Sequence, residues 1–256
     1  MHLQVDNVSK RFGAGAGAKL VLDRVSLDLH AGEFVALVGS SGSGKSTVMR
    51  LIAGLDHPTS GAITIDGDPV RGPGSDRGMV FQKYSLYPWL TAGQNVAFGM
   101  ELQGRSRQEI RERTSYFLEV VGLADAARRL PRELSGGMQQ RIAIARALAA
   151  EPKVLLLDEP FGALDIQIRE SMQEFLHQLW RQTGLTALLI THDLEEALLL
   201  AHRVHILAPS PGRIVRTVDV DLDRSSMAHL RVTPAFLELR EELAQGLRSL
   251  EPALLR

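Results

Sequence analysis

Residues 33–55 read EFVALVGSSGSGKSTVMRLIAGL, and this stretch decides the fold. The apolar run from Glu33 to Val38 predicts a buried strand, and the run from Thr47 to Leu55 predicts a helix that ends near Gly54. Between them lies a loop of glycines and serines with the pattern G-x-x-x-x-G-K-[ST]. A strand, such a loop and a helix in this order predict an α/β fold with an anion site at the start of the helix.

This loop, here called the phosphate loop, supplies each part that phosphate binding needs. Glycines let backbone N–H groups curl around phosphate oxygens, and the following helix turns its positive end toward the same anion. We expect Lys45 to neutralise β and γ phosphates and Ser46 to place a hydroxyl on Mg²⁺. The alternative, a glycine turn without function, is disfavoured by the flanking strand and helix. The predicted phosphate-binding residues are Gly39, Ser40, Ser41, Gly42, Ser43, Gly44, Lys45, Ser46 and Thr47.

A second apolar strand, Val154 to Leu157, is followed by two carboxylates. Ligands of parallel sheets bind at strand ends, so we predict Asp158 as an anchor for Mg²⁺. Glu159 is predicted to be the base that orients and polarises the attacking water. An acidic strand end can instead meet a helix dipole, but the phosphate loop in the same chain favours the catalytic interpretation.

Composition excludes several other classes of protein. The chain has 256 residues with 29 Lys+Arg against 30 Asp+Glu, a net charge of −1, so we expect no nucleic-acid partner. The absence of cysteine excludes disulfides and thiolate chemistry. No apolar run reaches membrane-spanning length and the N-terminus resembles no secretory signal, so we expect an intracellular protein.

The remaining chain alternates between helical and strand-like patterns. Residues from about 84 to 150 are predicted to be mainly helical, with one helix starting after Ser135. From Val154 onward strands and helices alternate, which predicts a parallel sheet covered by helices. Asp193 and Glu196 are predicted to cap a helix, and another helix is expected after Pro234.

The octapeptide Leu134–Arg141, LSGGMQQR, is a second glycine-containing loop that opens a helix, and so a second anion site. It resembles the signature motif of ABC-type ATPases, and the resemblance covers nearly the whole chain. This resemblance implies a head-to-tail dimer that encloses two ATP molecules. Ser135, Gly136 and Gly137 would then bind the ATP held by the phosphate loop of a second copy, or of a paralogous ATPase subunit.

The resemblance also implies the architecture. We expect a P-loop NTPase core, a mostly parallel sheet flanked by helices, with an antiparallel β subdomain and a helical subdomain. One domain would span residues 1–256. Within it, residues 1–83 and 154–220 would form the core with the β subdomain, about 84–150 the helical signature subdomain, and about 221–256 a helical tail.

Four further positions match family motifs. The resemblance implies that Phe12 stacks on adenine, and that Gln82 contacts Mg²⁺ and the attacking water. It implies that Asp165 belongs to a loop that crosses the dimer and that His192 contacts the γ-phosphate. The alternatives are a core aromatic for Phe12 and a polar cap for His192. The family often has Asp where this chain has His202, a change expected to alter only local packing. No catalytic position is missing, so an active ATPase is expected.

The segment Tyr84–Leu90 gathers aromatic and apolar residues around Pro88, which suits a buried loop or an exposed docking surface. In the family this segment receives a helix of the membrane subunit, so transmembrane permease subunits are expected partners. Three stretches, residues 72–78, Tyr87–Leu90 and Pro211–Ile214, together resemble the nitrate/sulfonate/taurine group of bacterial importers.

That narrower resemblance implies an ATP-hydrolysing subunit at the cytoplasmic face of the bacterial inner membrane. It would drive uptake of a small solute, such as nitrate, a sulfonate or taurine, delivered by a periplasmic or extracellular substrate-binding protein. The alternatives are an importer of another small solute and an ABC ATPase without a transport function.

Overall fold

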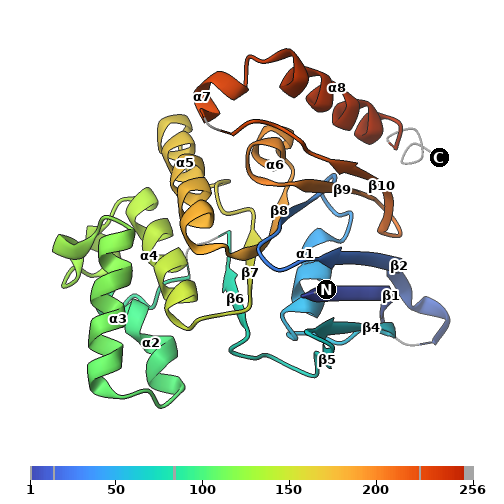
Figure 1. The fold of residues 1–256 in the computed structure, drawn as a ribbon. Helices are drawn as coiled ribbons and strands as arrows, with labels where there is room; N and C mark the ends of the chain where they lie inside the picture. The colour runs from blue at the N-terminus through green and yellow to red at the C-terminus, as the bar shows by residue number, and fades with distance from the viewer. Residues whose placement is uncertain (1, 14, 83–84, 225, 251–256) are drawn as a thin grey trace. The chain divides into compact units, whose positions relative to one another are not determined.

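The computed structural model describes residues 2–13, 15–82, 85–224 and 226–250. Figure 1 shows the order of the elements along the chain. The chain divides into two compact units, unit 1 with residues 1–74 and 177–256, and unit 2 with residues 75–176. It passes between them after Gly74 and within one long helix, α5 (Ile166–Thr183).

Unit 1 contains an antiparallel sheet with the strand order β2-β1-β4-β5. Its strands are β1 (Leu3–Phe12), β2 (Lys19–Leu29), β4 (Ser60–Ile65) and β5 (Asp68–Pro69). Leu3 lies between Leu29 of β2 and Ile65 of β4, and all three side chains are buried. Alternation of buried and exposed residues along β1 gives the sheet one core face and one solvent face.

A second group of strands in unit 1 has the order β10-β9-β3-β8. It consists of β3 (Phe34–Val38), β8 (Thr186–Thr191), β9 (Arg203–Ala208) and β10 (Arg213–Asp219). β3 pairs in parallel with both β8 and β9, and every residue of β3 and β8 is buried. Because β3 and β8 run in parallel, the residues that follow them, Gly39 and His192, leave the sheet at the same edge.

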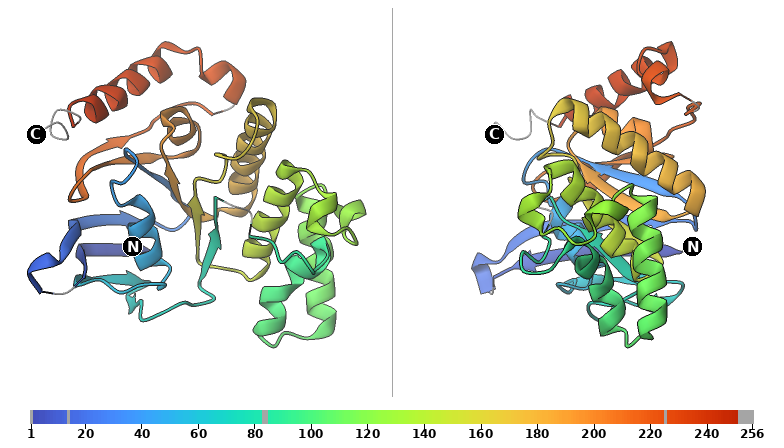
Figure 2. Two further views of the ribbon diagram at one scale, coloured as in Figure 1. Left: turned by 180° about the vertical axis from the view of Figure 1, so that it is seen from behind. Right: turned by 90° about the vertical axis from the view of Figure 1, so that its left-hand side faces the viewer.

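The helices of unit 1 cover these strands. They are α1 (Lys45–Ile52), α6 (Leu194–Leu200), α7 (Met227–Leu230) and α8 (Pro234–Arg248). α1 stops before Gly54, which has a φ of 73° and whose backbone approaches Gly72 so closely that a Cβ would lie 2.1 Å from the carbonyl oxygen of Gly72. Figure 2 shows α8 from two further sides. The predicted strand at Thr186–Thr191 and the helix after Pro234 are confirmed.

Unit 2 consists of a parallel strand pair and a group of helices. The strands are β6 (Arg77–Val80) and β7 (Val154–Asp158). The helices are α2 (Ala92–Leu102), α3 (Arg107–Val120) and α4 (Gly136–Ala149), with short turns at Ala124–Ala126 and Pro131–Glu133. The mainly helical character predicted for this region is confirmed, including the helix that starts after Ser135.

None of the helices among the described residues combines the length and the apolar composition that crossing a bilayer requires.

Candidate active site

The phosphate loop connects β3 to α1 in unit 1, and its glycines are required by the backbone. Gly42 and Gly44 have φ values of 77° and 102°, a region that other residues rarely adopt. A Cβ at Gly44 would lie 2.7 Å from Leu22 Cδ2, and one at Gly39 would lie 2.6 Å from the carbonyl oxygen of Leu207. The loop therefore packs too closely against its surroundings to accept side chains at either end.

Lys45 reaches back across this loop. Its Nζ donates to the carbonyl oxygens of Gly39, at 2.7 Å, and Ser40, at 3.0 Å. The Ser43 hydroxyl is buried and finds no hydrogen-bond partner among the described residues. Buried polar atoms are normally paired, so a cationic loop with an unsatisfied buried hydroxyl fits an anionic ligand.

His192 lies beside the start of the phosphate loop. Gly39, Ser40 and His192 line a cavity of about 210 Å³, together with residues from the end of β9 and from the C-terminal part of the chain, Leu207, Pro209, Leu247 and Leu250. The structure thus brings His192 to the loop that is predicted to hold phosphate.

The backbone around His192 is held by a buried hydrogen-bond network. Thr191 Oγ1 donates to Glu196 Oε2 at 2.6 Å and accepts from the backbone N–H of Asp193 at 3.0 Å. Asp193 caps α6 by accepting from the N–H groups of Glu195 and Glu196. Glu196, the other predicted cap residue, lies in the first turn of α6, and its buried carboxylate accepts from the Thr191 hydroxyl.

The paired carboxylates lie in unit 2. Asp158 is the last residue of β7, and Glu159 follows it with a φ of 45°, a conformation that costs a non-glycine residue about 1–3 kcal/mol. Gln82 Nε2 donates to Glu159 Oε2 at 3.2 Å. A Cβ at Gly162 would lie 3.4 Å from that Gln82 nitrogen, so glycine leaves room for the pair. Sequence analysis predicted both residues, and the structure places them in contact.

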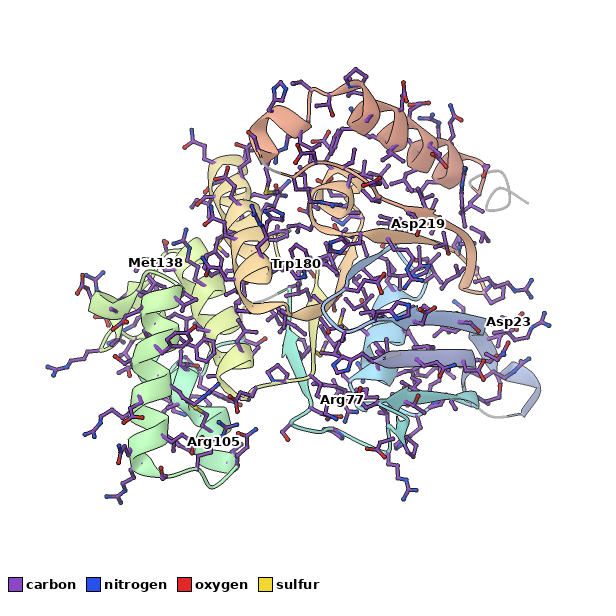
Figure 3. All side chains as sticks on the ribbon, viewed as in Figure 1. Asp23, Arg77, Arg105, Met138, Trp180 and Asp219 are labelled. Carbon is purple, nitrogen blue, oxygen red and sulfur yellow. The ribbon has the colours of Figure 1, made fainter. Side chains whose placement is uncertain are left out.

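The signature segment Leu134–Arg141 opens α4. Ser135 is the exposed N-cap, and its Oγ accepts from the N–H of Met138, which Figure 3 labels, at 3.3 Å. A Cβ at Gly137 would lie 2.6 Å from Ile168 Cγ2, so glycine lets α4 and α5 pack closely. Asp165 Oδ1 accepts from the N–H of Ile168 at 3.0 Å, which places Asp165 at the start of α5. The segment and Asp165 therefore lie on adjoining helix starts in unit 2.

Phe12 ends β1, and 45% of its surface is exposed. Lys10 Nζ lies 4.9 Å from the centroid of its ring and pairs with Asp56 Oδ1 at 2.6 Å. An aromatic ring this exposed is no core residue, and its free face suits stacking on a planar group.

The predicted docking segment begins at Tyr84, which lies outside the described residues. In the described part, Trp89 has 72% of its surface exposed, while Tyr87 packs on Phe98 with ring centroids 4.5 Å apart. Tyr87 is therefore half-buried, and the buried-loop alternative fails for Trp89.

Two residues that sequence reasoning missed hold this segment in place. Fully buried Asn95 donates through Nδ2 to the carbonyls of Tyr87 and Leu90, and its Oδ1 accepts from the Tyr87 N–H at 2.8 Å. Arg146 donates to the carbonyl of Ser85 at 2.8 Å, and burial lowers the pKa of its guanidinium. A polar residue inside the apolar pattern of residues 92–100 was the available signal for Asn95.

His202 occupies a packing position in unit 1. Its Nδ1 accepts from the backbone N–H of Phe34 at 3.1 Å, and its ring lies 4.6 Å from that of Trp180, which Figure 3 labels. Burial lowers the pKa of His202. These contacts fit the expected local role in packing.

The residues present fit a magnesium ion that is bound together with phosphate. Among the described residues no cluster of three or more His, Asp or Glu side chains forms a metal cage. Mg²⁺ commonly uses one or two carboxylates, waters and substrate phosphates instead. In unit 1, Ser46 in the first turn of α1 offers a hydroxyl, and in unit 2, Asp158 at the end of β7 offers a carboxylate; both are residue types that this mode of binding uses.

Three features define a P-loop nucleoside triphosphatase: a phosphate loop between a strand and a helix, paired carboxylates at the end of another strand, and a second helix start whose N-cap is exposed. The family model described as "ABC transporter" matches residues 22–162. The chain therefore belongs to the ABC transporter family, and it is an ATPase that uses ATP with Mg²⁺.

Comparisons with individual proteins agree with this family. The chain is 49% identical to the nitrate import ATP-binding protein NrtD of Synechocystis, covering 98% of this chain and 97% of that protein. It is 46% identical to the taurine import ATP-binding protein TauB of Sinorhizobium fredii, covering 94% and 92% respectively. A solved dimeric ABC transporter cassette has a TM-score of 0.75 and 36% identity over 86% of this chain and 99% of that one. Another, in a post-hydrolysis state with ADP and Pi, has a TM-score of 0.74 and 34% identity over the same shares.

Proposed function

We propose that this ATPase drives the uptake of a small anion, such as nitrate, a sulfonate or taurine, through separate membrane subunits. Import ATP-binding proteins for nitrate and taurine are similar to this chain over nearly its whole length, which supports this substrate class. The observation that carries the coupling to a membrane subunit is the exposed Trp89 on a segment that Asn95 and Arg146 hold in place.

The assignments of residues are part of the same proposal. Glu159 acts as the base toward the attacking water, and Gln82, hydrogen-bonded to it, contacts water and Mg²⁺. Asp158 and Ser46 hold Mg²⁺, and Lys45 binds the β and γ phosphates. Phe12 stacks on adenine and His192 contacts the γ-phosphate. Residues 1–83 and 154–220 act as the nucleotide-binding core, about 84–150 as the helical signature subdomain and about 221–256 as a tail.

Two copies of the chain, or one copy and a paralogue, close on two ATP molecules. Ser135 with the N–H groups of Gly136 and Gly137 offers the γ-phosphate two or three charge-assisted hydrogen bonds, at roughly 1.5–3 kcal/mol each. Shifting a two-state equilibrium from about 1:99 to 99:1 needs about 5.5 kcal/mol, so two such sites suffice. Asp165 lies in the loop that crosses this dimer. Loss of the γ-phosphate on hydrolysis removes these bonds and opens the pair.

The permease docks on the surface around Trp89. In the same unit, a groove of about 660 Å³ lies between α2 and α3, and its apolar lining includes Ala97, Ile110 and Leu118. Arg107 and Arg111 lie on its rim, and Arg105, labelled in Figure 3, is ion-paired to Glu151 at 2.8 Å. A helix with apolar anchors and acidic flanks fits such a surface. The ATPase then lies at the cytoplasmic face of the inner membrane, and a periplasmic or extracellular binding protein delivers the solute.

The test is to reconstitute the chain in lipid vesicles with the permease subunits encoded beside it. ATP turnover is measured with and without a binding protein loaded with nitrate, taurine or another sulfonate. Stimulation by one loaded binding protein supports uptake of that solute. Turnover that ignores every binding protein, or no assembly with the permease, favours an ABC ATPase without a transport function.

Two variants sharpen this test. Trp89→Ala is expected to weaken assembly with the permease while leaving ATP binding by the chain unchanged. Tyr116→Ala, which removes another exposed aromatic from α3, is the matched control and is expected to assemble normally.

A further inference from the structure

The C-terminal helix α8 ends beside the phosphate loop. Leu247 in its last turn and Leu250 just beyond it line the cavity of about 210 Å³ that also contains Gly39, Ser40 and His192. These two apolar side chains come from a part of the chain to which no motif assigns a role in ATP hydrolysis.

The backbone of α8 is fixed where it approaches this cavity. A Cβ at Gly246 would lie 2.7 Å from Ile206 Cδ1, so the helix presses directly on β9 at this point. Earlier in the helix, Phe236 and Leu243 are buried in unit 1, with 1% and 0% of their surfaces exposed. Figures 1 and 2 show α8 running alongside β9, β10 and α6. Packing at Phe236, Leu243 and Gly246 holds this end of the helix against the strands of unit 1.

Charged pairs connect α8 to the elements around His192. Arg240 Nε lies 3.5 Å from Oε1 of Glu195, which belongs to α6 three residues after His192. Glu242 pairs with Arg216 of β10. Exposed ion pairs contribute little stability, so these contacts serve mainly to orient the helix. α8 is therefore connected to His192 in two ways. It is ion-paired to α6, the helix that follows His192, and its end lines the same cavity as His192.

We propose that Leu247 and Leu250 are positioning residues for His192. They form an apolar side of the cavity that the imidazole also lines, and they hold the ring toward Gly39 and Ser40, where the γ-phosphate is expected. Because the His192 side chain is exposed, a wall on one side limits the directions in which the ring can turn. A contact group held in its productive orientation loses less entropy when it meets the phosphate. This inference rests on the proposed role of His192, and it gives the C-terminal helix a part in hydrolysis.

The first test measures kcat and KM for ATP in the full-length chain assembled with its permease. Leu247→Ala combined with Leu250→Ala is expected to lower kcat roughly tenfold, since small losses of positioning are costly, with KM for ATP changed less than about twofold. Leu247→Met, which preserves apolar volume, is expected to retain most of the rate. Leu237→Ala, an exposed leucine of the same helix, is the control and is expected to leave both constants unchanged.

The second test separates positioning from general destabilisation. In a His192→Ala background, adding Leu247→Ala is expected to cause no further loss of kcat, because the leucine acts through the imidazole. A purely structural effect would instead lower the rate by the same factor in both backgrounds, and that result would overturn the inference.

A third measurement needs no turnover. The ring ¹H–¹³C resonance of His192, identified by its loss in His192→Gln, is recorded by NMR in the isolated full-length chain. Leu247→Ala is expected to shift this resonance, whereas Leu237→Ala leaves it in place. An unmoved resonance together with an unchanged kcat in the double leucine variant overturns this inference alone. Full hydrolysis by His192→Ala overturns both this inference and the proposed role of His192.

Discussion

Glu159 shows how the fold prepares a single residue for chemistry. It adopts a left-handed backbone conformation directly after β7, and its carboxylate accepts a hydrogen bond from Gln82. Strained residues of this kind persist where their surroundings determine the conformation, and they concentrate at functional sites. The strain points to a carboxylate that is held for a task beyond stability.

Glu159→Gln is therefore expected to lower kcat by about 10²–10⁴-fold, because an amide cannot act as a base toward water. Gln is close in size to Glu, so affinity for ATP is expected to remain within a few fold of the parent. Phosphate release and nucleotide binding, measured separately, check the two parts. A variant that hydrolyses ATP at the parental rate would show that the base lies elsewhere.

Buried histidines make the stability of unit 1 depend on pH. Burial lowers the pKa of His205 to about 4, and its Nδ1 lies 2.8 Å from Thr217 Oγ1. Burial also lowers the pKa values of His177 and His202. In the unfolded chain these groups bind protons first as the pH falls, so the free energy of unfolding decreases as the pH falls. For His205 the stabilisation is complete above about pH 6.5 and is lost toward about pH 4.

For His205 this loss amounts to about 2 kcal/mol of unfolding free energy between pH 7 and pH 5. His205→Leu is expected to flatten that part of the dependence, since the exposed Thr217 hydroxyl can bind water instead. Urea unfolding at several pH values measures the effect. If the free energy of unfolding of His205→Leu falls as steeply with pH as that of the parent, groups other than His205 are responsible for the pH dependence.

At the scale of elements, the start of α2 holds the docking segment in its shape. Thr91 and Gln94 form a capping box, and Asn95 in the next position binds backbone groups of Tyr87 and Leu90. One buried amide therefore connects the helix to the loop that presents Trp89.

Asn95→Ala is expected to lower the free energy of unfolding by about 1–3 kcal/mol, because it leaves buried backbone groups without partners. It is also expected to weaken assembly with the permease while ATP affinity stays unchanged, since the phosphate loop lies in unit 1. Gln108→Ala, an exposed amide on α3, is the control. Normal assembly of Asn95→Ala with the permease would show that docking does not depend on the conformation of this loop.

At the scale of the whole molecule, the proposed clamp requires two chains. Each chain carries one phosphate loop in unit 1 and one signature segment in unit 2, and the signature segment includes the exposed Ser135. Two solved cassettes that are similar to this chain are dimers.

Glu159→Gln with ATP and Mg²⁺ is expected to form a stable dimer, because the γ-phosphate is bound and not released. ADP is expected to leave the chain monomeric, and Ser135→Ala in the same background is expected to weaken the dimer by about 1.5–3 kcal/mol per site. Light scattering after size exclusion gives the mass. A monomer under ATP would show that the permease is needed for closure or that the clamp is wrong.

The sequence by itself determined the class of protein, because phosphate chemistry places unusual residues at short, fixed spacings. Gly39–Thr47, Asp158 with Glu159, and Leu134–Arg141 are such local patterns, and the strand and helix around each follow from apolar periodicity. Only the tertiary structure decided which distant residues support them. Four contacts join residues that are brought together by the packing of whole elements. They are the hydrogen bond between Gln82 and Glu159, the hydrogen bonds from Asn95 and Arg146 to the segment that ends at Leu90, the hydrogen bond from Thr191 to Glu196, and the approach of α8 to the cavity beside His192. Such contacts leave no periodic signal in the chain, since they depend on where whole elements come to lie and not on the order of neighbouring residues.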